Sequence, residues 1–241
     1  MNSSDLNYIK SQLKSVFKKN IIPAIVIILL ELLIVILYKS NTFITSFLTI
    51  LSIWKYNLSY IYSFLSTGLF MGLIPWGLSF ISRKKVVDPI LHTSLFMFIS
   101  YGIVGIQSDA LYRVQTWLFG DSGMFTVLCK MFFDQFVWTL FYMSHVNYWI
   151  IWIFNNNLKL PFCSVGNIIR YLKRDWIVGL VGGYIIWIPS CIVIYSMEKD
   201  LQMIMNNLIG VFFVIVMNTI TKNENEKENE TNEVDIGDEE I

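Results

Sequence analysis

Lys130 and Asp134 are the first residues in this sequence whose type and spacing suggest chemistry. They stand four positions apart in a long apolar segment, so on an α-helix they share one face and are able to form a salt bridge. His145 follows Asp134 after eleven residues, which places it about 20° from the same face at roughly 100° per residue. Phe141 falls nearby. The spacing therefore predicts a polar stripe along one helix, with Gln135 beside Asp134.

Two interpretations of this stripe are open. In the first, it lines a path for small solutes, and Lys130 and Asp134 set its charge selectivity, because charges inside a membrane are costly unless they face protein or water. In the second, Lys130 reaches to the membrane interface, Asp134 fastens its helix to a neighbour, and His145 is a satisfied polar group. Glu31, alone in another apolar segment, poses the same choice between a structural partner and a role in transport.

The rest of the sequence offers little for familiar enzyme chemistry. Its three cysteines are far apart, and its two histidines are too few for most histidine-based metal sites. The chain contains no glycine-rich phosphate loop, zinc-protease motif or serine nucleophile elbow. The net charge is zero and the 18 basic residues form no dense stripe, which argues against a nucleic-acid partner. We predict a non-enzymatic protein without a metal or a cofactor.

Composition indicates a membrane protein. Hydrophobic residues make up 55% of the 241 residues and charged residues only 15%, against about 25% charged residues in soluble domains. Apolar stretches without strand-like alternation indicate helices, and a bilayer requires roughly 20 residues for each span. We predict an all-α transmembrane bundle of five or six spans, the candidates being Ile21–Tyr38, Leu58–Ile81, Ile90–Ile106, Phe125–Phe154, Trp176–Met197 and Leu201–Ile220.

The segments around these spans differ in character. Residues 1–20 have the pattern of a basic amphipathic helix, which is either interfacial or organelle-targeting. Residues 41–56 suit an interfacial or re-entrant piece, and the acidic tail 221–241 is predicted to be disordered. This topology puts 13 cations on the side of both termini and 4 on the other, namely Lys39, Lys55, Arg113 and Lys199. Both termini should therefore face the positive-inside compartment.

Landmarks between Trp54 and Ile220 follow the order of motifs in a known family. The matching positions are Trp54 and Tyr56, then Gly68, Met71 and Gly72 in a Gly-x-x-Met-Gly-Leu stretch, Gly102 and Gly105 in a Gly-x-x-Gly pair, Tyr112, and finally Trp187. The most specific match is Lys-x-x-x-Asp-Gln at Lys130, Asp134 and Gln135, eighteen residues after the tyrosine. The chain thus resembles the family of the 22-kilodalton peroxisomal membrane protein, also called the Mpv-seventeen family.

The chain is a divergent member on this comparison. Ile106 and Leu111 stand where the family has a proline and a tryptophan, and a late signature survives only as Trp187 with a displaced Pro189. Residues 21–38 would be an extra N-terminal span before the family-like membrane domain of residues 54–220.

The resemblance implies a channel or permeability factor for small solutes or metabolites in the mitochondrial inner membrane, with the peroxisomal or another intracellular membrane as the alternative. It assigns helix packing to the motif residues Gly68, Met71, Gly72, Gly102, Gly105, Tyr112 and Trp187. Gly68 and Gly72 have the small-xxx-small spacing of closely packed helices, either within the monomer or in a homo-oligomer. The rival hypothesis is a structural or assembly protein whose polar residues only hold helices together. In both cases the lipid bilayer is a partner.

Overall fold

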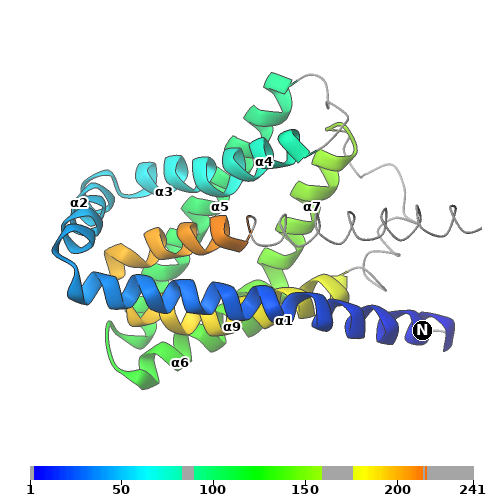
Figure 1. The fold of residues 1–241 in the computed structure, drawn as a ribbon, viewed down its shortest axis with the longest axis horizontal. Helices are drawn as coiled ribbons and strands as arrows, with labels where there is room; N and C mark the ends of the chain where they lie inside the picture. The colour runs from blue at the N-terminus through cyan, green and yellow to red at the C-terminus, as the bar shows by residue number, and fades with distance from the viewer. Residues whose placement is uncertain (1–2, 83–89, 159–175, 214, 216–241) are drawn as a thin grey trace, which may run out of the picture.

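The computed structural model describes residues 3–82, 90–158, 176–213 and 215. All regular secondary structure within these residues is helical, which confirms the predicted all-α class (Figure 1). In this part of the chain, five helices are long and apolar enough to cross a membrane: Lys10–Ser40, Tyr60–Leu78, Ile90–Phe119, Met124–Phe154 and Trp176–Ser196. The chain is a multi-span integral membrane protein.

The first helix, α1 (Ser3–Ser40), joins two segments that the sequence separated. Residues 3–20 of the predicted amphipathic segment and the predicted span 21–38 lie in one helix, which continues through Pro23. Its 38 residues correspond to about 57 Å, far more than the roughly 30 Å of a hydrocarbon core. Helix α1 packs along α9 (Trp176–Ser196).

Helix α2 (Thr42–Leu58) crosses one end of the bundle between α1 and α3 (Figure 1). Asn41 begins it as an N-cap, its side-chain oxygen accepting a hydrogen bond from the backbone N–H of Ile44 at 3.1 Å. Its apolar side chains are largely exposed, while Lys55 is buried. The segment predicted to be interfacial or re-entrant is therefore a helix with a buried cation.

The second and third spans pack against each other. The second runs through α3 (Tyr60–Thr67), a π-helical segment η1 (Gly68–Leu73) and α4 (Ile74–Ser82), and both α3 and η1 pack against α5 (Ile90–Phe119). Helix α5 is longer than the predicted span Ile90–Ile106, which ended too early. Its last turns contain Asp109 and Gln115, which are buried inside the protein, so the polar residues that suggested a loop are accommodated in a helix.

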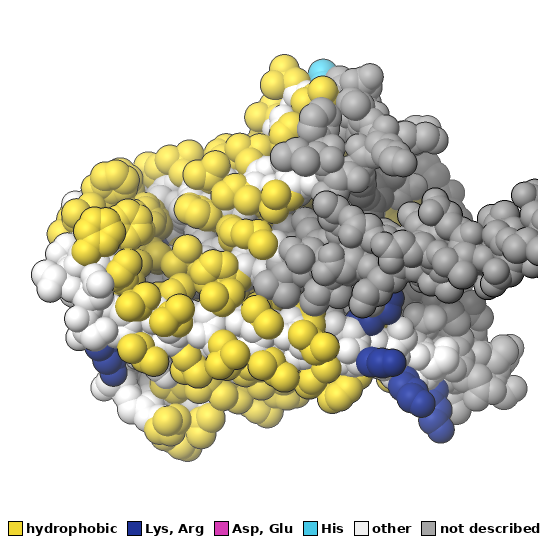
Figure 2. Space-filling view, in the orientation of Figure 1, with side chains coloured by type: hydrophobic (Ala, Val, Ile, Leu, Met, Phe, Trp, Pro, Cys, Tyr) yellow, Lys and Arg dark blue, Asp and Glu magenta, His cyan; other side chains and the backbone are white. Residues whose placement is uncertain are grey.

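The outward faces of these helices suit contact with lipid. On α5, Leu91, Leu95, Ile99 and Ile103 are exposed at intervals of four residues, whereas Met97 is buried. Hydrophobic side chains also cover most of the surface over α1, α2 and α3 (Figure 2). Such apolar surface would be unfavourable in water, and it matches the lipid-facing side of a transmembrane bundle.

The motif glycines lie where the second and third spans touch. A Cβ atom at Gly68 would lie 2.7 Å from the carbonyl oxygen of Phe98, and one at Gly72 would lie 2.6 Å from that of Met97. At Gly102 the neighbour is the ring of Phe64, and at Gly105 it is Thr67. These four glycines therefore let two helices approach within the monomer, in the way that small-residue faces do in membranes.

The remaining helices complete the bundle. Helix α6 (Met124–Phe133), the π-helical segment η2 (Asp134–Met143) and α7 (Ser144–Asn155) form one continuous span. Residues 199–213 are also helical and include many of the most buried side chains, such as Leu201 and Ile209. This helix runs between α1 and α3 (Figure 1). The rest of the predicted sixth span lies outside the described residues except for residue 215, and so does the tail 221–241.

One end of the bundle gathers the cations assigned to the minority side. Lys55, Arg113 and Lys199 all line a single cavity there, as expected if they belong to one side of the membrane. At the opposite end, basic side chains mark the N-terminal part of α1 (Figure 2). Most other cations assigned to the side of the termini, those in residues 83–85, 159–174 and 222–227, lie outside the described residues.

We expect Gly105→Val to destabilise the protein by about 1–3 kcal/mol, because the added side chain overfills a packed interface. A Cβ atom there would already lie 2.5 Å from Thr67 Oγ1 and would also crowd the carbonyl oxygen of Ser63. Thermal unfolding of the full chain in lipid nanodiscs measures the effect. The matched control is Gly77→Ala, since Gly77 has open space around it. Equal melting temperatures for Gly105→Val and the wild type would contradict the packing role.

Candidate functional site

Lys130 and Asp134 do not form the predicted ion pair. Lys130 is 1% exposed and its Nζ donates to Thr116 Oγ1 on α5 at 2.9 Å. Asp134 accepts hydrogen bonds from the Tyr195 hydroxyl and from Thr139 Oγ1, the latter at 3.3 Å. Lys130 is thus bonded to α5, whereas Asp134 is bonded to α9.

The predicted stripe is also broken at Phe141, which is 72% exposed on the outside of the bundle. The projection assumed a regular α-helix, but residues 134–143 are π-helical. A π-helix closes its hydrogen bonds from i to i+5 and holds more residues in each turn. Angles counted at the α-helical period therefore accumulate error across this segment. His145, beyond it, stacks on Trp176 with ring centroids 5.2 Å apart, and it lines neither of the two cavities described below.

Asp134 is the centre of a buried polar cluster between η2 and α9. In addition to Tyr195 and Thr139, Gln135 Nε2 approaches it at 3.4 Å and Cys191 Sγ at 3.7 Å. Gln135 Nε2 also donates to Cys191 Sγ at 3.1 Å, while Gln135 Oε1 is buried without a hydrogen-bond partner among the described residues. This cluster keeps a carboxylate in the bundle interior and leaves one acceptor unused.

A central cavity of about 100 Å³ adjoins this cluster. Asp134 and Gln135 line it, together with three further polar side chains from other helices: Ser108, Asn147 and Asn206. Among the described residues this lining contains no lysine or arginine, and its polar groups are mainly hydrogen-bond acceptors and neutral amides. The motif residues Met71 and Trp187 also line it, which gives them a place at the cavity rather than a role in packing alone.

Both π-helical segments contribute to the central cavity. Met71 belongs to η1, and η2 supplies Asp134, Gln135, Trp138, Thr139 and Met143. Such wide turns are rare in proteins and occur often at functional sites. The helices thus depart from regular α-helical geometry where they line the central cavity.

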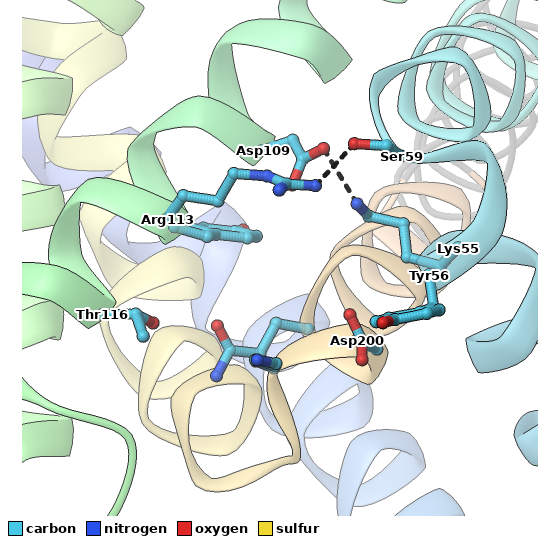
Figure 3. A pocket seen from close by; sticks show the side chains of 10 residues that line it. Lys55, Tyr56, Ser59, Asp109, Arg113, Thr116 and Asp200 are labelled. Atoms are coloured by element: carbon cyan, nitrogen blue, oxygen red, sulfur yellow. Dashed lines mark hydrogen bonds and ion pairs between the residues drawn. The ribbon is translucent and has the colours of Figure 1, made fainter.

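A second cavity, of about 240 Å³, lies at the end of the bundle where α2, α5 and the start of the helix 199–213 meet (Figure 3). Lys55 Nζ donates to Asp109 Oδ2 at 2.8 Å, and Arg113 Nε donates to Asp109 Oδ1 at 3.2 Å. Asp109 also accepts from Ser63 Oγ at 3.0 Å. One buried carboxylate therefore binds two cations at this end cavity.

This ion cluster was missed in the sequence. Asp109 and Arg113 stand four residues apart, a spacing at which acid–base pairs often form on helices. The predicted span ended at Ile106, however, and so placed both in a loop. Lys55 could not be assigned as a partner, because its separation of 54 residues from Asp109 becomes contact only in the folded bundle.

Tyr112 connects the two cavities, since it lines both. Its ring meets that of Tyr195 edge to face, with centroids 5.5 Å apart, and the Tyr195 hydroxyl is bonded to Asp134. The Tyr112 ring thus lines both cavities and is linked through Tyr195 to the cluster around Asp134.

Glu31 finds its partner on α9. It is 0% exposed, and Ser190 Oγ donates to Glu31 Oε1 at 2.5 Å. Its other oxygen, Oε2, has no hydrogen-bond partner among the described residues. Glu31 lines neither cavity, which favours the structural interpretation, a link between α1 and α9.

No described part of the chain brings together three or more His, Cys, Asp or Glu side chains in a way that could hold a metal ion. No model of a known protein family, no curated protein and no solved structure matches this chain. The function is therefore argued from the geometry of the two cavities.

Double-mutant cycles should show that Lys55 and Asp109 are coupled in their effect on stability, whereas Lys130 and Asp134 are not. Asp109→Leu is expected to destabilise the protein by about 3–5 kcal/mol, because it leaves Lys55 buried without its counter-charge. Lys55→Met should cost less, since Asp109 keeps Arg113 and Ser63. The double variant should be more stable than the sum of the single losses predicts.

The same cycle on Lys130→Met and Asp134→Asn serves as the comparison. Because these two side chains have different partners, their effects should add within about 0.5 kcal/mol. The stability of all variants is read from thermal unfolding in nanodiscs. Coupling at Lys130 and Asp134 as strong as at Lys55 and Asp109 would contradict the assignment of partners.

Proposed function

We propose that the protein is a non-enzymatic channel or permeability factor for small polar solutes. The observation that carries this proposal is that one residue, Tyr112, lines both the end cavity and the central cavity, each of which has polar or charged side chains in its wall inside an apolar bundle. A chain that only anchors itself in lipid has no need for hollow polar space, and polar groups within spans commonly mark solute paths.

The path begins at the end cavity, passes Tyr112 and enters the central cavity beside Asp134 and Gln135. The unused Gln135 Oε1 supports this route, because a buried acceptor without a partner is costly and a solute or water would satisfy it. Lys130 and His145, which the sequence placed on the same path, are left out of this route because neither lines either of the two cavities.

The identity of the membrane in which the protein resides is also part of this proposal. The resemblance of residues 54–220 to the Mpv-seventeen family supports the mitochondrial inner membrane, with the peroxisomal membrane as the alternative. The retained landmarks Met71, Tyr112 and Trp187 line the central cavity, which is where residues tied to a solute path would be kept.

The alternative is a structural or assembly protein. Three observations favour it: Asp134 accepts several hydrogen bonds, Lys130 is bound by Thr116, and Glu31 joins α1 to α9. Under this hypothesis the polar residues serve only to hold helices together, and the cavities are packing defects.

Planar-bilayer recording of the purified protein distinguishes the two hypotheses. We expect discrete openings whose preference for cations falls roughly severalfold in Asp134→Asn, because the carboxylate is the charge that lines the central cavity. The matched control is Asp121→Asn, an exposed carboxylate in the turn before α6, which should leave selectivity unchanged. Folded wild-type protein that stays silent across voltages would favour the structural hypothesis.

Tyr112→Ala should raise the conductance, because it removes the ring that lines both cavities. Tyr112→Phe keeps the ring and serves as the control for the loss of the hydroxyl group alone. Flux of small neutral polyols into liposomes measures the same opening independently of charge. A conductance that is unchanged in Tyr112→Ala, with the protein still folded, would place the path elsewhere.

A further inference from the structure

The end cavity is lined by charges of both signs, which come from three helices (Figure 3). Lys55 comes from α2, Asp109 and Arg113 come from α5, and Asp200 comes from the first turn of the helix 199–213. A cavity of about 240 Å³ is large enough for several water molecules or a small organic solute. The charged and hydrogen-bonding groups on each wall therefore indicate which class of ligand the cavity would bind.

The wall formed by α2 and α5 is cationic. Lys55 and Arg113 share the single carboxylate of Asp109, so this cluster keeps one net positive charge. Arg113 is held in place, because its guanidinium lies 4.7 Å from the centroid of the Tyr60 ring and donates to Ser59 Oγ at 2.8 Å. An ammonium group has three donors and a guanidinium five, which leaves donors for a carboxylate ligand.

The wall formed by the helix 199–213 supplies two acceptors, Asp200 and Gln202, next to the exposed cation Lys199. Gln202 is 1% exposed, lines the cavity, and has an Oε1 atom without a hydrogen-bond partner among the described residues. Its Nε2 donates to the carbonyl oxygen of Met197 at 3.1 Å, which fixes the orientation of the amide. Asp200 lies across the cavity from Arg113 (Figure 3). This wall is suited to a ligand group that donates hydrogen bonds and carries positive charge.

We propose that the end cavity is a binding site for a small zwitterion, with its carboxylate at Lys55 and Arg113 and its ammonium group at Asp200 and Gln202 Oε1. A simple anion would leave the Gln202 acceptor unsatisfied and would face the carboxylate of Asp200. A simple cation would face Lys55, Arg113 and the exposed Lys199. A zwitterion meets both walls, and an amino acid is the smallest common solute of this kind.

This inference rests on the proposed function in one respect, since it makes the bound zwitterion the solute that permeates. Binding to the full chain in nanodiscs and flux into liposomes are separate measurements. Binding without flux would refute the channel and keep the site. Flux of other solutes without zwitterion binding would refute the site and keep the channel.

The test compares each zwitterion with its two halves. Alanine is matched by propionate and ethylamine, and γ-aminobutyrate, which separates its charges further, is matched by butyrate and propylamine. Binding is measured by calorimetry on the full chain in nanodiscs. We expect at least one zwitterion to bind, and to bind roughly tenfold or more tightly than its acid and its amine, because each half loses one set of charge-assisted hydrogen bonds.

Two variants locate the site. Arg113→Gln and Asp200→Asn should each weaken zwitterion binding roughly tenfold or more, and Asp200→Asn should leave the weak binding of the acid unchanged or stronger. Both side chains are less buried than Lys55, so these variants should fold. Lys39→Gln and Asp121→Asn, exposed charges that do not line the cavity, are the matched controls.

Three results would overturn the proposal. The acid binding as tightly as the zwitterion would make the cavity an anion site, and the amine doing so would make it a cation site. Folded wild-type protein that binds neither zwitterion would remove the site altogether.

Discussion

The carboxylate of Asp109 holds one end of the helical bundle together, and the rest of the arrangement depends on this group. It sits inside a membrane protein and is 4% exposed, so it is stable there only because Lys55, Arg113 and Ser63 bind it. These partners come from three different helices. The same contacts join α2 and α3 to α5 and form one wall of the end cavity.

The interior follows from close helix packing around the helix 199–213. The motif glycines bring the second span onto α5, and Thr67 Oγ1 then donates to Asn207 Oδ1 at 3.0 Å. Polar contacts of this kind are specific in an apolar surrounding because no water competes for the groups. Space remains where the two π-helical segments interrupt this packing, and the central cavity is found there.

The two cavities have complementary lining. The end cavity is lined by both cations and carboxylates, whereas the central cavity contains Asp134, amides and hydroxyl groups without a described cation. Tyr112 lies between them. A solute with a positive group would thus meet acceptors in both cavities, while the cations at the end would admit its carboxylate. Under the proposed function, charge selection would belong to the end cavity and hydrogen bonding of the solute to the central cavity.

The sequence by itself determined the membrane class, the helical fold and most of the spans, because apolar length and composition are local properties of the chain. It also singled out Asp134, Gln135, Met71, Tyr112 and Trp187, all of which line the central cavity. Only the tertiary structure decided the partners. Lys130 and Asp134 stand one α-helical turn apart, yet Lys130 bonds to Thr116 on α5 and Asp134 bonds to Tyr195 on α9. Lys55 meets Asp109 only after 54 residues of chain have folded back. Pairing in a bundle depends on which helices touch, and that is settled by packing of all the helices together.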